Sequence, residues 1–131
     1  MRRTLTVSLA LLGLAGSAVA GPAMDTDGDG MIDALDNCIT VANAHPADCD
    51  VDQDGYGSGC DGDFDNGGTV NAGDFTNTFV PEFLAGVYTL TDMDCGGTTN
   101  SGDFTLQFVP QFLQGFPGPS GLSCAGTVPC P

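Results

Sequence analysis

Four acidic segments of twelve residues constrain what this chain can fold into. We call them loop 1 (25–36), loop 2 (50–61), loop 3 (63–74) and loop 4 (92–103). Each carries Asp at positions 1, 3 and 12 and Gly at position 6. Of the 17 acidic residues, only Asp48 and Glu82 lie outside them. A merely solvated acidic surface would not place its carboxylates in one register, so the pattern indicates ion-binding loops.

The first twenty residues have the pattern of a secretory signal peptide. Arg2 and Arg3 precede the apolar run 5–14, and the small residues Ala18 and Ala20 mark a cleavage site after Ala20. The run is shorter than the roughly 20 residues that a transmembrane helix needs. We therefore expect a secreted, extracellular protein whose mature chain has no transmembrane segment.

Removal of residues 1–20 leaves a strongly acidic chain. It keeps all 17 acidic residues and loses the only two Lys or Arg residues, so its formal charge is −17 with His45 neutral. Such a chain repels itself unless cations come from outside. We expect no nucleic-acid binding, because no Lys or Arg remains to neutralise the phosphates. With one histidine and no lysine, no nucleophile and base can pair, so we expect no enzymatic activity.

The ligand types and their spacing predict calcium as the ion. Calcium takes about six to eight oxygen ligands, and an EF-hand loop supplies them from positions 1, 3, 5, 7, 9 and 12. Loop 1 offers all six, namely Asp25, Asp27, Asp29, the Met31 carbonyl, Asp33 and Asp36. Loop 2 offers Asp50, Asp52, Asp54, the Tyr56 carbonyl, Ser58 and Asp61.

Loops 3 and 4 depart from this pattern at position 5, where Gly67 and Gly96 replace an acid. Loop 3 retains Asp63, Asp65, Thr69, Asn71 and Asp74, and loop 4 retains Asp92, Asp94, Thr98, Asn100 and Asp103. Because fewer anionic ligands weaken calcium binding, we expect two to four bound ions. Magnesium keeps more of its waters and zinc prefers Cys and His, so both are weaker candidates.

A longer repeat contains loops 3 and 4. The pattern Gly-Asp-Phe-Thr-x-x-Phe-Val-Pro-x-Phe-Leu-x-Gly occurs at 73–86 and again at 102–115, and the repeat period is 29 residues. Its aromatic residues recur at helical spacing, as Phe75, Phe79 and Phe83 and as Phe104, Phe108 and Phe112. We expect them to pack in the core. The sequence predicts a helix over about 72–79, a kink or restart at Val80-Pro81 and one further turn, with the same arrangement in the second copy.

Six cysteines in a secreted chain of this length indicate a disulfide framework. Six cysteines allow 15 connectivities, and the short spacing between Cys124 and Cys130 favours their pairing. The predicted fold is therefore a small, mostly irregular chain stabilised by calcium and disulfides. It should contain a few short α-helices and little or no β-sheet.

The N-terminal loops resemble the thrombospondin type 3 repeat. That family runs DxDxDG loops followed by DNC and later CD, and this chain has Asp36-Asn37-Cys38 and Cys60-Asp61. The resemblance implies a chain wrapped around calcium and a Cys38–Cys60 disulfide. Because Cys49 is an additional cysteine, the alternative of Cys38–Cys49 with Cys60–Cys95 stays open.

Residues 61–115 resemble a type I dockerin, a duplicated loop–helix unit with Asp at position 12 of each loop. The resemblance implies calcium loops and helices that bind a cohesin module, with recognition positions at Ala72-Gly73 and Ser101-Gly102. We thus divide the chain into a signal peptide (1–20), thrombospondin-like loops (21–60), a dockerin-like domain (61–116) and a Cys-bearing tail (117–131).

The sequence predicts a secreted calcium-binding module for adhesion or protein interaction. Its partner would be an extracellular protein, such as a cohesin-like one, or a second copy of the chain. The alternative is a structural subunit that assembles with itself into a filament or surface layer.

Overall fold

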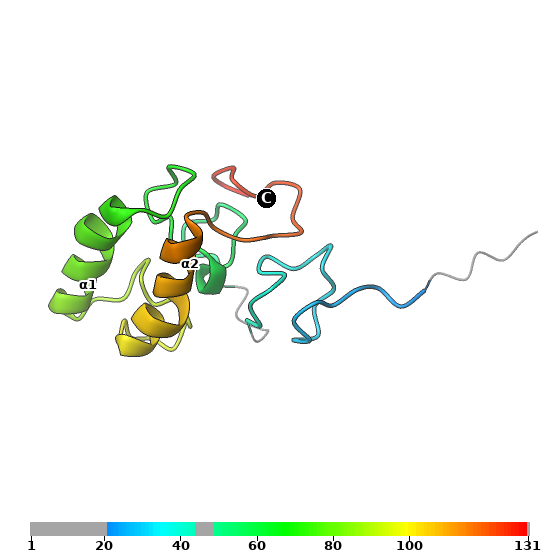
Figure 1. Ribbon diagram of the computed structural model, residues 1–131, viewed down its shortest axis with the longest axis horizontal. Helices are drawn as coiled ribbons and strands as arrows, with labels where there is room; N and C mark the ends of the chain where they lie inside the picture. The colour runs from blue at the N-terminus through cyan, green and yellow to red at the C-terminus, as the bar shows by residue number, and fades with distance from the viewer. Residues whose placement is uncertain (1–20, 44–48, 131) are drawn as a thin grey trace, which may run out of the picture.

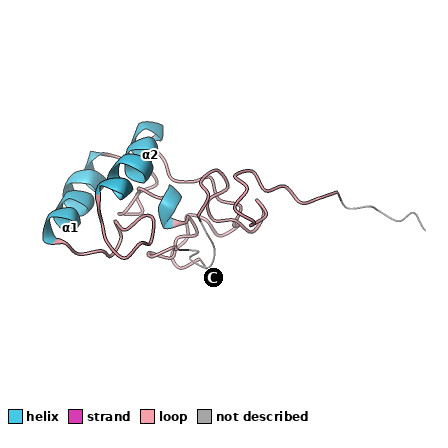
Figure 2. Cartoon of the chain, turned by 90° about the horizontal axis from the view of Figure 1, so that it is seen from below, coloured by secondary structure: helices cyan, strands magenta, loops and turns pink. Residues whose placement is uncertain are grey.

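Short helices and turns make up the fold. A computed structural model describes residues 21–43 and 49–130, so the predicted signal peptide, His45 and Asp48 lie outside the described residues. Within those ranges the chain forms helices and loops but no strand, as Figure 2 shows. Three disulfides link it. The predicted class, a small irregular disulfide-stabilised chain with a few short helices, is confirmed.

Two helical arms lie side by side at one end of the molecule (Figure 1). The first consists of the π-helix η2 (Asp74–Phe79) followed by α1 (Val80–Ala85), and the second of η3 (Asp103–Phe108) followed by α2 (Val109–Gln114). A short 3-10 helix, η1 (Ser58–Cys60), precedes them. Gly86 and Gly115, both with left-handed backbone, end the two arms.

The expected kink at Val80-Pro81 takes the form of a change from π-helix to α-helix. Phe79 and Val80 both keep helical dihedrals, and the Val80 N–H donates to the Phe75 carbonyl five residues earlier. Pro81 falls in the first turn of α1, where its missing N–H needs no partner. The helix therefore continues through the proline without a break.

The core lies between the two arms and the loops before them. Phe64, Val70, Phe79, Met93 and Phe108 are buried, and Phe75, Leu90 and Phe104 pack against them. The rings of Phe79 and Phe108 lie 5.3 Å apart. The prediction was wrong for Phe83 and Phe112, which are 43% and 41% exposed. They lie in α1 and α2, the C-terminal parts of the two arms.

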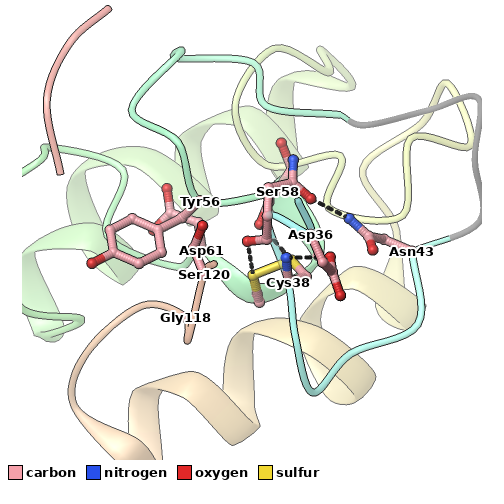
Figure 3. The surroundings of a disulfide bond; sticks show 12 residues. Asp36, Cys38, Asn43, Tyr56, Ser58, Asp61, Gly118 and Ser120 are labelled. Atoms are coloured by element: carbon pink, nitrogen blue, oxygen red, sulfur yellow. Dashed lines mark hydrogen bonds between the residues drawn. A yellow bond between two sulfur atoms is a disulfide. The ribbon is translucent and has the colours of Figure 1, made fainter. Parts of the chain in front are cut away.

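The disulfides settle the alternatives left open by the sequence. Cys38 pairs with Cys60, Cys124 pairs with Cys130, and Cys49 pairs with Cys95. The first two pairings confirm the predictions, and the alternative of Cys38–Cys49 with Cys60–Cys95 is wrong. Figure 3 shows the Cys38–Cys60 bond, which is buried between loops 1 and 2. The Cys49–Cys95 bond joins the region of loop 2 to loop 4.

The segment predicted as a Cys-bearing C-terminal tail contacts the N-terminal loops. It turns back after α2 and lies against loops 1 and 2 (Figure 1). The N–H groups of Gly118, Gly121 and Gly126 donate to the carbonyls of Cys60, Asp36 and Asp54, respectively. Among the described residues, no helix is both long and apolar enough to cross a membrane.

Candidate metal centres

Four groups of Asp side chains, one in each loop, can each hold a metal ion. The members of each group offer one oxygen apiece, and these oxygens lie within 4.8 Å of one another. The groups are Asp25, Asp27 and Asp29; Asp50, Asp52 and Asp54; Asp63, Asp65 and Asp74; and Asp92, Asp94 and Asp103. Twelve of the predicted ligands are thus brought together by the fold.

The four loops share one backbone conformation. Position 6 is a glycine with a positive φ in every loop, at Gly30, Gly55, Gly68 and Gly97. Position 4 also has a positive φ in every loop, at Gly28, Gln53, Asn66 and Cys95. A left-handed conformation is costly for a side chain such as Gln53. Its recurrence at an equivalent position shows that the loop shape, and not the local residue, determines this turn.

The position-1 carboxylate organises each loop. In loops 2, 3 and 4 its two oxygens accept hydrogen bonds from the N–H groups of positions 5 and 6, as Asp50 does from Asp54 and Gly55. In loop 1, Asp25 accepts them from Gly28 and Gly30. These bonds hold one carboxylate at the inside of the turn, where the other Asp side chains of the group converge.

In loops 3 and 4 the position-12 Asp folds back across the loop. Asp74 accepts hydrogen bonds from the N–H groups of Asp65 at 3.3 Å and Asn71 at 2.8 Å. Asp103 accepts the equivalent bonds from Asp94 and Asn100. Each of these Asp residues is the first residue of a π-helix. The helix therefore places the carboxylate of its first residue across the preceding loop, next to the other Asp side chains of the group.

In loops 1 and 2 the position-12 Asp contacts the chain beyond the loop instead. Asp36 accepts a hydrogen bond from the Cys38 N–H, and Asp61 accepts one from the Asp63 N–H. Neither belongs to the group of its own loop, in which position 5 takes the third place. The other oxygen of Asp36 is buried without a hydrogen-bond partner, as is one oxygen of Asp27. Unpaired buried carboxylate oxygens fit a cation in loop 1.

Burial of the carboxylates disfavours their ionised form. Burial raises the pKa of Asp61 to about 8 and that of Asp54 to about 6, opposed in part by backbone hydrogen bonds and reinforced by neighbouring carboxylates. Burial also raises the pKa of Asp36, Asp52, Asp63 and Asp92. A bound cation would favour the ionised form of each group. The donor set consists of hard oxygens, which suit calcium.

Several predicted ligands have other contacts in the structure. Asp33 accepts hydrogen bonds from the N–H and hydroxyl of Thr26, and the Ser58 hydroxyl accepts one from the Val51 N–H. Asn71 and Asn100 each accept a bond from the glycine two residues later, and their amides donate to the carbonyls of Thr69 and Thr98. The N–H groups of Met31 and Tyr56 donate to the position-5 carboxylates.

Glu82 is a residue whose role the sequence did not indicate. Its carboxylate accepts hydrogen bonds from the N–H groups of Thr89, Leu90 and Thr91 and from both threonine hydroxyls. Burial acts to raise the pKa of Glu82, but these hydrogen bonds outweigh it and hold the pKa below its ordinary value. Glu82 thus fixes the linker between α1 and loop 4, and it lies outside the four Asp groups.

Comparisons with family models, with curated proteins and with solved structures found no match for this chain.

Proposed function

We propose that this protein is an extracellular calcium-binding module whose four loops fold around calcium ions. The observation that carries the proposal is the repetition of one loop shape, in which positive φ at positions 4 and 6 accompanies a group of three Asp side chains. A chance acidic surface would have no reason to repeat both. Calcium supplies the positive charge that residues 21–131 lack. Calcium binding should then stabilise the folded chain.

We further propose that residues 25–61 act as thrombospondin type 3-like loops and residues 61–115 as a dockerin-like unit. The Cys38–Cys60 disulfide and the absence of long helices in the described part of loops 1 and 2 support the first. The π-helices that follow loops 3 and 4 support the second. Both halves would serve adhesion or protein interaction outside the cell, without enzymatic activity.

Apolar surface on the helical arms supports a protein partner. One cavity of about 310 Å³ is lined by Phe75, Phe79, Val80, Phe83, Leu84, Ser101 and Phe104. A second, of about 210 Å³, is lined by Phe75, Phe104, Phe108, Val109 and Phe112. Leu84 and Leu113 beside them are 77% and 79% exposed. Clustered apolar side chains on a highly charged chain are typical of an interaction site.

Self-assembly is the second candidate function, and the same cavities favour it. Val80 and Phe83 in the first cavity occupy the repeat positions of Val109 and Phe112 in the second. Two copies could therefore meet through equivalent faces, as symmetric oligomers do. Sedimentation of the calcium-loaded protein distinguishes the candidates. Assembly that Leu84→Asp with Leu113→Asp abolishes supports a structural subunit, whereas a monomer supports a different protein as partner.

The number of bound ions tests the proposed function directly. Native mass spectrometry of the chelator-stripped protein, returned to calcium, should detect up to four ions. Replacing Asp92, Asp94 and Asp103 with Asn should remove one ion. The matched control Glu82→Gln removes a carboxylate outside the four groups and should keep the full number. A protein that retains no calcium, or that loses none in the loop 4 variant, would contradict the proposal.

A further inference from the structure

The C-terminal segment 116–130, here called the strap, contacts loops 1 and 2 through their backbone carbonyls. On loop 2, the N–H groups of Gly126 and Cys130 donate to the carbonyls of Asp54 and Gln53 at 2.7 and 2.6 Å. The Ser120 hydroxyl donates to the Gly55 carbonyl at 2.7 Å. These are the carbonyls of positions 4, 5 and 6, none of which an EF-hand-type loop uses for calcium. The strap therefore holds the loop from its outer side.

The strap also reaches loop 1 and the Cys38–Cys60 disulfide. The Gly121 N–H donates to the Asp36 carbonyl at 2.8 Å, and the Gly118 N–H donates to the Cys60 carbonyl at 2.9 Å. Figure 3 shows Gly118 and Ser120 next to Tyr56 and Asp61. One segment thus touches position 12 of loop 1 and the central turn of loop 2.

The strap and the two loops approach so closely that Gly121 and Gly55 leave no room for a side chain. A Cβ on Gly121 would overlap the carbonyl oxygen of Asp33. A Cβ on Gly55 would lie 2.7 Å from the Cys130 sulfur and 2.9 Å from the Ala125 Cα. Cys124–Cys130 closes the end of the strap into a small ring, which places the Gly126 and Cys130 N–H groups on the same loop.

Loops 3 and 4 have no such support. Among the described residues, no hydrogen bond joins the strap to residues 63–74 or 92–103. Their position-12 Asp residues start helices and fold back across the loop. Loops 1 and 2 lack a following helix of that kind, and the strap occupies the place of that support.

We infer that the strap sets the calcium affinity of loops 1 and 2, and not that of loops 3 and 4, by fixing the backbone that positions their Asp groups. This inference rests on the proposed function. Gln53 illustrates the mechanism, because the Cys130 N–H donates a hydrogen bond to its carbonyl at the left-handed turn (φ 62°) of loop 2. Residues behind a metal's ligands typically change its affinity about 10- to 100-fold.

The test compares two strap variants of the full chain with a matched control. Gly121→Ala introduces the overlap with loop 1, and Cys124→Ser with Cys130→Ser opens the ring that holds loop 2. Gly21→Ala makes the same change as Gly121→Ala at a position with no atom nearby. Ser120→Ala removes one hydrogen bond and serves as a milder variant if the stronger ones do not fold. Calcium affinity is followed loop by loop through the amide resonances of Gly30, Gly55, Gly68 and Gly97.

We expect Gly121→Ala to weaken loop 1, and the opened ring to weaken loop 2, by about tenfold or more, with loops 3 and 4 unchanged. In the calcium-free protein, amide hydrogen exchange should accelerate in residues 50–61 of the opened-ring variant but not in 92–103. Unchanged affinity in loops 1 and 2, or an equal loss in all four loops, would overturn the inference. Failure of the unaltered protein to bind calcium in any loop would instead refute the proposed function.

Discussion

The N-terminal pair of loops (25–61) and the C-terminal pair (63–103) place similar Asp groups on different supports. In the C-terminal pair, each loop leads directly into a helix, and Asp74 and Asp103 at the start of those helices complete the groups. In the N-terminal pair, positions 1, 3 and 5 form the group, and a buried disulfide and the strap take the place of the helix.

This difference shows that the position-5 residue and the support of the loop vary together. Loops 1 and 2 have Asp29 and Asp54 at position 5, and their position-12 Asp residues bond to the chain that follows. Loops 3 and 4 have glycine at position 5 and draw their third carboxylate from position 12. Each loop thus clusters three carboxylates, but the third comes from position 5 in loops 1 and 2 and from position 12 in loops 3 and 4. Substitutions at these positions should therefore have different effects in the two pairs.

The largest expected effect comes from the core beneath the C-terminal pair. Phe108→Ala should destabilise the protein by about 3–5 kcal/mol, because the buried ring contacts Phe64, Phe75 and Phe79. Thermal unfolding measures the loss, and hydrogen exchange locates it. Protection should fall in loops 3 and 4 first. Leu113→Ala, an exposed control in the same arm, should change stability little.

Removal of the Cys38–Cys60 disulfide should destabilise the N-terminal pair, loops 1 and 2. The double variant Cys38→Ser with Cys60→Ser is expected to lose about 2–5 kcal/mol, since both sulfurs are buried and the bond closes the segment holding both loops. Exchange should accelerate in loops 1 and 2 while α1 and α2 keep their protection. Equal loss of protection in both pairs would remove the distinction between the two supports.

The stability of the calcium-free protein should depend on pH because of buried carboxylates in the N-terminal pair of loops. Burial raises the pKa of Asp61 from an ordinary 3.8 to about 8, so the folded state binds this proton more tightly than the unfolded state. Stability in chelator should therefore rise as the pH falls from about 8 to about 4. Denaturant titration measures it. Asp61→Asn should flatten the dependence, and a steep dependence that survives this change would contradict the assignment.

The smallest expected effect tests position 5. Gly96→Asp should strengthen calcium binding in loop 4 by roughly tenfold, or about 1.4 kcal/mol, because it restores an anionic ligand. The added side chain meets only the movable Asp94 carboxylate. Gly96→Ala brings the same steric change without the ligand and should not strengthen binding. Calorimetry of both variants decides whether position 5 limits loop 4.

The sequence predicted the parts of this molecule that depend on local spacing. The twelve clustered Asp residues, the glycines at position 6, the helical arms and the Cys124–Cys130 pair follow from short-range pattern. The Cys38–Cys60 pair was expected only from the resemblance to the thrombospondin type 3 repeat. The positive φ at Gln53 and Cys95 was not predicted, since neither residue type indicates a left-handed turn.

Contacts between residues far apart in the chain could not be predicted from the sequence. The strap lies on loop 2 because the N–H groups of Gly126 and Cys130 donate to carbonyls about 75 residues earlier. Every residue type except proline has a main-chain N–H, so the residue types do not indicate these contacts. Phe83 and Phe112 share the spacing of the buried phenylalanines, yet about two-fifths of each side chain is exposed. Glu82 contacts a linker whose course depends on the packed arms.

A calcium titration resolved by loop tests whether each of the four Asp groups binds calcium. The position-6 glycines Gly30, Gly55, Gly68 and Gly97 give one amide reporter in each loop, and each donates to its position-1 carboxylate. We predict that all four resonances shift and saturate, with loops 3 and 4 requiring more calcium than loops 1 and 2. Resonances that do not move below millimolar calcium would show that the loops are an acidic surface on a disulfide framework, and would contradict the account.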